Sequence, residues 1–246
     1  SHIFSKLPLQ PNLSKMSATF NFQSDFTHFK GDLFVLNDLG LDMGGRFNLT
    51  KYPDYFHLES LELTGNGGML NIQGLLENRG RFNGTIELDA LDMSQWMVNQ
   101  PKTNLSGYVL ADGEIFESQI TALDINAEIN ESLLFNREAS SFSGGLSYKD
   151  YELTITNPLT VTIGPSIIYV NGTANFELKI MDLNLTLTDA STFLINNFWT
   201  DSLSSGSATG SMALMGSFDS LGMDADLLIT DFKYKNISCL LSPPAP

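Results

Sequence analysis

The sequence predicts an all-β protein whose strands form one elongated antiparallel sheet. Three observations predict it. Apolar residues alternate with polar ones along most of the chain, turn residues separate the alternating runs, and one order of strand, turn and helix recurs after about 98 residues. A period of two places the apolar side chains on one face of each strand and the polar side chains on the other. The predicted sheet therefore has one dry face and one wet face.

The alternating runs that define the dry face extend from about residue 60 to residue 187. Between Leu123 and Ile129, for example, every second residue is apolar and the intervening residues are acidic or asparagine. Turn residues bound the runs at Gly65–Gly68, Asn78–Gly80, Ser143–Gly145 and Gly164–Pro165. The candidate lining of the dry face consists of Leu61, Leu63, Leu70, Ile72, Ile86, Leu88, Leu123, Ile125, Leu159, Val161, Ile163, Val170, Leu183, Leu185 and Leu187.

A change of period occurs at two places. In Leu185–Trp199 the alternation gives way after Asp189 to apolar residues at helical spacing, and Asp92–Met97 follows the preceding strand in the same way. Each segment opens with an aspartate, whose carboxylate can accept the free N–H groups of a first helical turn. The sequence therefore predicts short amphipathic helices about 98 residues apart. Their apolar residues, which we expect to cap the edge of the dry face, are Trp96, Met97, Phe193, Leu194 and Phe198.

The match between the two halves extends outward from these predicted helices. Leu61–Gly74 aligns without a gap on Leu159–Gly172, and Ser106–Gly107 matches Ser205–Gly206. Agreement in the order of strand, turn, helix and glycine indicates an internal repeat. We place the two units at residues 31–128 and 129–226 of a single elongated segment. About 20 strands spaced about 4.8 Å apart would make a sheet on the order of 100 Å long.

The charge balance argues against nucleic acid as a partner. The chain has 13 Lys and Arg against 28 Asp and Glu, for a formal net charge of −15 at pH 7, and such a surface repels phosphate backbones. His2, His28 and His57 lie far apart without the spacing of metal ligands, and Cys239 has no histidine nearby. We therefore expect no metal, no cofactor and no catalytic residues, and predict that the protein is not an enzyme.

No part of the sequence predicts a membrane segment. No apolar run approaches the roughly 20 residues of a membrane span, and no basic segment followed by an apolar one predicts a signal peptide. The chain begins at Ser1 and ends in a proline-rich stretch, so we expect a fragment of a longer protein. Membrane contact is then expected through regions outside this fragment.

The order of elements resembles that of a known family. In the first copy, "LNIQG" leads to "GTIELDALDM", a short helix and "TNLSGYVLADG"; in the second, "YVNG" leads to "LNLTLTDASTFL" and "SSGSATGSMALMGSFDSLGMDADLLI". The spacing of Gly206, Gly210 and Gly216, followed by Gly222, is the most typical part. Over roughly residues 40 to 230 this pattern resembles the repetitive periplasmic region of the TamB family, within the AsmA-like group of bacterial envelope proteins.

The resemblance implies a fold and a function. The fold is a long β-sheet curved lengthwise into a U-shaped hydrophobic groove, or β-taco. Proteins of the family are anchored in the inner membrane of Gram-negative bacteria, cross the periplasm, and are associated with phospholipid transport toward the outer membrane. They also support the assembly of outer-membrane proteins alongside a barrel partner of the TamA type. The implied ligands are phospholipid acyl chains, bound along the dry face.

The residues alone leave the nature of the dry face open. Alternation by itself favours the closed core of a sandwich, whereas the repeat and the resemblance favour an open groove. Two other functions also remain open. One is a periplasmic scaffold or chaperone whose exposed strand edges template outer-membrane β-strands, and the other is a structural extracellular β-repeat protein with a closed core.

Overall fold

The computed structural model describes residues 15–98, 102–117, 119–134, 137–191, 204–234 and 237–238. These residues form fifteen strands and one short 3-10 helix, which confirms the all-β prediction. The strands are β1 (Met16–Ser24), β2 (His28–Asn37), β3 (Asp42–Lys51), β4 (Tyr55–Gly65), β5 (Gly68–Glu77), β6 (Arg81–Leu91), β7 (Asn104–Phe116), β8 (Gln119–Leu134), β9 (Arg137–Lys149), β10 (Glu152–Ile163), β11 (Ser166–Asn175), β12 (Ile180–Ser191), β13 (Ser204–Ser217), β14 (Ser220–Tyr234) and β15 (Ile237–Ser238). The helix η2 spans Met93–Gln95.

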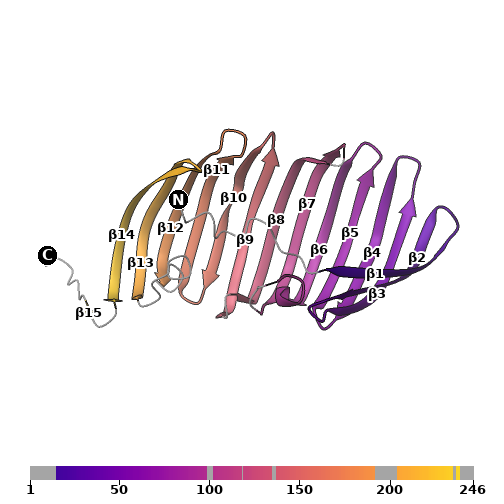
Figure 1. Cartoon of the computed structure of the whole chain (residues 1–246), viewed down its shortest axis with the longest axis horizontal. Coiled ribbons are helices and arrows are strands. Elements are labelled where there is room, and N and C mark those ends of the chain that lie inside the picture. Colours follow the sequence, from indigo (N-terminus) through magenta and orange to yellow (C-terminus); the bar gives the residue numbers. More distant parts are fainter. Residues whose placement is uncertain are drawn as a thin grey trace.

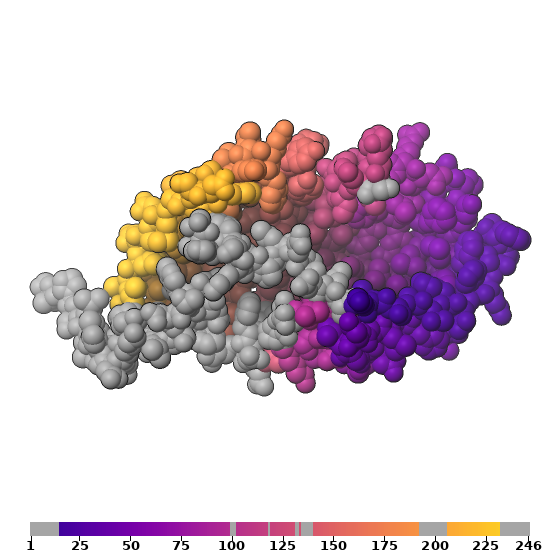
Figure 2. All heavy atoms as spheres, viewed as in Figure 1, coloured from indigo at the N-terminus to yellow at the C-terminus, as the bar shows by residue number. Residues whose placement is uncertain are grey.

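Every described strand belongs to a single sheet. The strands follow one another in sequence order from β1 to β15, and each pair for which a register is given is antiparallel. Figure 1 shows this order as a row of hairpins, with β1 and the C-terminal strands at opposite ends of an open sheet. In Figure 2 the central strands are set back between the two ends, so the face in view is hollowed.

The strands are longer and fewer than the sequence predicts. The described sheet has fifteen strands rather than about twenty. One prediction that failed is the turn at Ser143–Gly145, which lies inside β9, so the chain continues as a strand through these residues. At about 4.8 Å per strand, the sheet measures roughly 70 Å across its strands instead of 100 Å. The unit boundary predicted between residues 128 and 129 falls inside β8.

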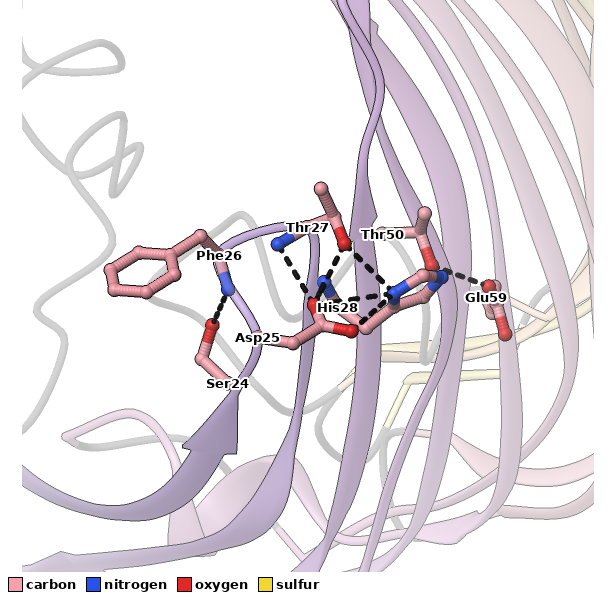
Figure 3. Close-up of polar contacts among 7 residues, drawn as sticks. All are labelled: Ser24, Asp25, Phe26, Thr27, His28, Thr50 and Glu59. Carbon is pink, nitrogen blue, oxygen red and sulfur yellow. Dashed lines mark hydrogen bonds and ion pairs between the residues drawn. The ribbon is translucent and has the colours of Figure 1, made fainter.

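The turn between β1 and β2 illustrates how side chains fix the hairpins (Figure 3). Oδ1 of Asp25 accepts hydrogen bonds from the amides of Thr27 at 3.0 Å and His28 at 2.7 Å, and from the Thr27 hydroxyl at 2.7 Å. Ser24 Oγ accepts the amide of Phe26, whose φ is +74°. These bonds, led by that from the His28 amide, hold the pKa of Asp25 well below its usual range. The ionised aspartate therefore closes the turn.

The first expected helix is a single 3-10 turn rather than an amphipathic helix over residues 92–97. Asp92 caps it as predicted: its Oδ1 accepts the amide of Ser94 at 3.1 Å, and also the amide of Thr103 at 3.1 Å. The side chain of Trp96, directly after the helix, packs against the largest buried cluster. That cluster contains Leu33, Val35, Leu41, Met43 and Leu63.

The structure differs from the prediction where the second helix was expected to begin. β12 continues through Asp189 to Ser191, and the rest of the predicted helix lies outside the described residues. Asp189 adopts φ +47°, its amide donates to Thr209 Oγ1 at 3.1 Å, and its carbonyl accepts the hydroxyl of Ser166 at 2.8 Å. These cross-strand partners hold Asp189 in an irregularity of the sheet instead of at a helix start.

The same irregularity occurs in the first half of the sheet. Ala90 has φ +53°, and its amide donates to Ser106 Oγ at 3.1 Å, as that of Asp189 does to Thr209. The structural counterpart of Ser106 is therefore Thr209, not Ser205 as the sequence match suggests. The reason is that the chain is longer between Ala190 and its partner in β13 than at the equivalent place in the first half.

Candidate functional site: the apolar face

The register of the sheet aligns apolar residues in rows that run across the strands. In what we call the first apolar row, each residue lies opposite the next on the neighbouring strand, from β1 to β14 without a break, and every member is apolar or glycine. The row consists of Phe20, Leu33, Gly45, Leu63, Leu70, Leu88, Gly107, Ile129, Phe142, Val161, Ile168, Leu187, Gly210 and Leu227.

A second apolar row runs beside the first, two residues along each strand. It consists of Phe22, Gly31, Phe47, Leu61, Ile72, Ile86, Val109, Ala127, Gly144, Leu159, Val170, Leu185, Met212 and Ala225. Gly144 and Leu159 are not register partners, but a Cβ on Gly144 would lie 2.7 Å from the Leu159 side chain. The row therefore continues across this irregularity.

Two shorter rows complete what we call the apolar face. The third row crosses β2 to β10 through Phe29, Leu49, Leu58, Gly74, Gly84, Ala111, Ile125, Leu146 and Ile155, and resumes at Gly172, Leu183, Leu214 and Met223. The fourth crosses β4 to β14 through Phe56, Leu76, Phe82, Gly113, Leu123, Tyr148, Leu153, Ala174, Met181, Gly216 and Leu221. Cross-strand neighbours share a face, so all four rows lie on one side.

The opposite side of the sheet, which we call the polar face, carries the polar residues that alternate with the apolar ones. Its central row consists of Asn21, Asp32, Arg46, Glu62, Asn71, Glu87, Tyr108, Glu128, Ser143, Thr160, Tyr169, Thr186, Ser211 and Asp226. Along β12 the two faces differ in exposure: Asp182, Asn184 and Thr186 are exposed, whereas the leucines between and after them are half-buried or buried. On β12, therefore, the more exposed side chains lie on the polar face.

Every residue predicted to line the dry face lies on the apolar face. Those from Leu61 to Leu88 fall in the first two rows on β4, β5 and β6. Those from Leu159 to Leu187, except Ile163, fall in the first three rows on β10, β11 and β12. Ile163 extends the face beyond the first row. Leu123 and Ile125 lie in the fourth and third rows on β8.

The predicted cap residues are only partly described. Trp96 contacts the apolar face at the cluster that contains Leu63, and Met97 is half-buried. Phe193, Leu194 and Phe198 lie outside the described residues.

Sequence reasoning missed the N-terminal strands and the glycines of the apolar face. Phe20, Phe22 and Phe47 alternate with polar residues, so the same period would have found them. Gly107 and Gly210 give no such signal. They have φ values of +151° and +144°, and an added Cβ would lie 2.0 and 2.1 Å from backbone oxygens of the next strand. They keep the first row continuous where a side chain does not fit.

An apolar hollow interrupts the face over β4 to β7. Its volume is about 590 Å³, and apolar atoms supply nearly all of its lining. Its floor consists of Gly74, Gly84 and Ala111, which are successive members of the third row. We call this hollow the apolar trench, because larger side chains of the second and fourth rows stand on either side of the floor.

The polar face carries the electrostatic contacts that bear on this site. Tyr108 Oη donates a hydrogen bond of 2.7 Å to Glu128 Oε2, which lowers the pKa of Glu128 and raises that of Tyr108. Within the described ranges, no group of three or more His, Cys, Asp or Glu side chains is placed to hold a metal ion. Among the described helices, none has the length and apolar character needed to cross a membrane.

Comparisons with known proteins give no further guide. No protein-family model, curated protein or solved structure matches this chain.

Proposed function

We propose that this chain is a segment of a TamB-like bridge that conducts phospholipids between the inner and outer membranes along the apolar face. The observation that carries the proposal is the continuity of the first two rows, which cross fourteen strands without a polar member. A lipid's acyl chains need an unbroken apolar surface, while the outside must remain wetted. A sheet with one apolar and one polar face supplies both.

In this proposal the apolar face is the inside of a U-shaped groove, with the short helix at its rim. The hollowed face in Figure 2 supports a curved sheet. The rings of Phe20 and Phe47 also support it, because they come from β1 and β3 and meet edge to face, 6.2 Å apart, above the intervening β2. Side chains on the inner side of a curved sheet converge in this way, whereas those on the outer side diverge.

The direction of the rows suits transport. Rows run across the strands, so an acyl chain that advances by one strand, about 4.8 Å, exchanges each apolar contact for a similar one. The gain from burial, about 0.8 kcal/mol per methylene group, then stays nearly constant along the path. Such movement forms and breaks no covalent bond, so the proposed function requires no catalytic group.

The cellular setting follows from the family resemblance. We place the segment in the periplasm, as part of a Gram-negative envelope protein anchored in the inner membrane through other regions. A barrel of the TamA type is the proposed outer-membrane partner, through which the bridge would also support outer-membrane protein assembly. The acidic composition, with a net charge of −15, suits a polar face that stays soluble beside anionic membranes.

The test compares neighbouring residues on opposite faces of β12. Leu185→Asp places a carboxylate in the second row, and we expect it to lower the phospholipid that copurifies with the chain by about fivefold or more, because a charge does not enter an apolar contact unpaired. Thr186→Asp is the matched control on the polar face and should leave bound lipid unchanged. Mass spectrometry measures the lipid, and circular dichroism checks the fold. Equal lipid content in the two folded variants would refute the groove.

One observation favours a second candidate function, the templating of outer-membrane β-strands. All nine residues of β1 are exposed, and this edge strand has neither a charged residue nor a proline, although such residues are the usual protection of an edge. A photocrosslinker at Thr19 would distinguish the two functions. Capture of unfolded barrel strands supports templating, whereas capture of phospholipid by a crosslinker at Leu185 supports conduction.

A further inference from the structure

We infer that the apolar trench is a discrete seat for one alkyl chain of an anionic amphiphile, with Lys51 as the site of its head group. The inference rests on the proposed function and deepens it, because it places one preferred position on a face that is otherwise uniform. The shared chemistry is an aliphatic tail with a carboxylate or phosphate at one end, which both a fatty acid and an anionic phospholipid supply.

The shape of the trench suits an extended chain. Its floor is the missing or small side chains of Gly74, Gly84 and Ala111 on three adjacent strands, so it runs across the strands rather than along them. Ile72 and Ile86 form the wall from the second row. With β4 included, it spans about 14 Å, a long and narrow space that accepts a linear tail better than a ring system.

The far wall and the ends of the trench are also apolar. Leu76 and Phe82, from the fourth row, face the isoleucines across the floor. The ring of Phe82 leans over β7, since a Cβ on Gly113 would lie 2.7 Å from it. Ile125, directly opposite Ala111, ends the small-residue floor at β8, and Leu58 ends it at β4. The seat is therefore bounded, unlike the rows on either side.

A cation stands at the end of the trench that β3 and β4 form. Lys51 Nζ lies 5.9 Å from the ring centroid of Phe56, which lines the trench and pairs with Lys51 in the register. Within the described residues, this lysine takes part in a cation–π contact and in no ion pair. In a chain with a net charge of −15, an unneutralised ammonium beside an apolar trench selects an anionic head group.

The experiment titrates the whole chain with cis-parinaric acid, a fluorescent fatty acid, and with its uncharged methyl ester. We expect one tight equivalent of the acid per chain. Ala111→Leu fills the floor and should weaken it about tenfold, because excluding about two methylene groups changes affinity by that order. Ala213→Leu, the matched control on the polar face, should not change the affinity.

Lys51→Gln tests the head-group site. It should weaken binding of the acid several-fold and leave binding of the ester unaffected, whereas the control Lys30→Gln on the polar face should change neither affinity.

A second arm incubates the same variants with phosphatidylglycerol vesicles and measures bound phospholipid by native mass spectrometry, which tells whether the occupant comes as free acid or as phospholipid. Loss of the one tight equivalent in Ala111→Leu in either arm supports the seat. Several equal equivalents that Ala111→Leu does not reduce would overturn the seat and leave the conducting face intact. Equal weakening of acid and ester by Lys51→Gln would overturn the head-group assignment. No lipid bound to the unmodified chain in either arm would refute the proposed function itself.

Discussion

Tyr108 and Glu128 lie directly opposite each other on β7 and β8, and the phenol donates a 2.7 Å hydrogen bond to the carboxylate on the polar face. The bond requires a protonated phenol and an ionised carboxylate. It lowers the pKa of Glu128 and raises that of Tyr108. Its stabilising contribution is therefore present between the two titrations, is lost as pH falls through the lowered pKa of Glu128, and is lost again as pH rises through that of Tyr108.

We predict that Tyr108→Phe lowers the urea midpoint at pH 7 and does so less at pH 2.5, because protonation of Glu128 as pH falls through its lowered pKa weakens the hydrogen bond. The measurement is urea unfolding of both chains at the two pH values. A difference of the same size at both would show that packing, and not the hydrogen bond, separates them. Tyr169→Phe, on the same polar row, is the control for loss of an exposed phenol.

The glycines of the first row should not tolerate a side chain. Gly107→Ala and Gly210→Ala combine a positive φ with a Cβ about 2 Å from a backbone oxygen. Each should lower the free energy of unfolding by about 1–3 kcal/mol, as measured by denaturant titration. Gly222→Ala is the matched control, because its nearest neighbour would lie at an ordinary 3.4 Å. Equal losses at all three positions would contradict the steric account.

Trp96 should hold the rim of the apolar face. Trp96→Ala removes a half-buried indole from the cluster of Leu33, Met43 and Leu63 and should cost about 2 kcal/mol of stability. Trp96→Phe retains most of the apolar contact and should cost less than half as much. Denaturant unfolding followed by circular dichroism measures both. If Trp96→Ala has the stability of the unmodified chain, the indole does not stabilise the rim.

Asp25 should stabilise the turn between β1 and β2 and so protect the amides of β1 from hydrogen exchange. Asp25→Ala removes the acceptor for the amides of Thr27 and His28, so we expect several-fold faster hydrogen exchange at the amides of β1. The pKa of Asp25 lies well below its usual range, so in the unmodified chain this protection should persist through pH 3 and fall only in stronger acid. Asp38→Ala, in another exposed turn, is the control. Unchanged exchange in β1 would contradict the role of the turn.

The uncharged edge of β1 should drive self-association. Phe20 and Phe22 are 57% and 59% exposed on this strand, and Phe22→Lys places a charge that is unfavourable for pairing with another strand. We expect lower average mass at high protein concentration by light scattering. Phe26→Lys, in the turn and 87% exposed, is the control for charge alone. An identical effect of both variants would assign the change to net charge.

The two faces of the sheet were predictable because alternation is local. Leu185 and Thr186 differ in polarity and are neighbours in a strand, so their opposite orientation follows from the period. The conformation of Asp189 was not predictable in this way. An aspartate can cap a helix or occupy a left-handed position in a sheet, and Ser166 and Thr209, which decide between these at Asp189, come from other strands.

The apolar trench could not be predicted from the sequence, because it depends on how the strands pair. Gly74, Gly84 and Ala111 are separated along the chain, and nothing in their spacing indicates that they lie side by side. Only the register of β5, β6 and β7 aligns them. Lys51 gives no signal either, because its contact with Phe56 depends on the pairing of β3 with β4.

The pairing of Leu61 with Ile72 in β4 and β5 recurs as that of Leu159 with Val170 in β10 and β11, six strands later. The sheet thus repeats with a period of about 29 Å, which is six times the spacing between strands. Joining Leu63 directly to Thr162 would remove one such period and place Leu61 opposite Val170 and Leu63 opposite Ile168. In the proposed bridge, the length of the sheet would then change in steps of one unit, and duplication of a unit would lengthen it without altering the pairing of its strands.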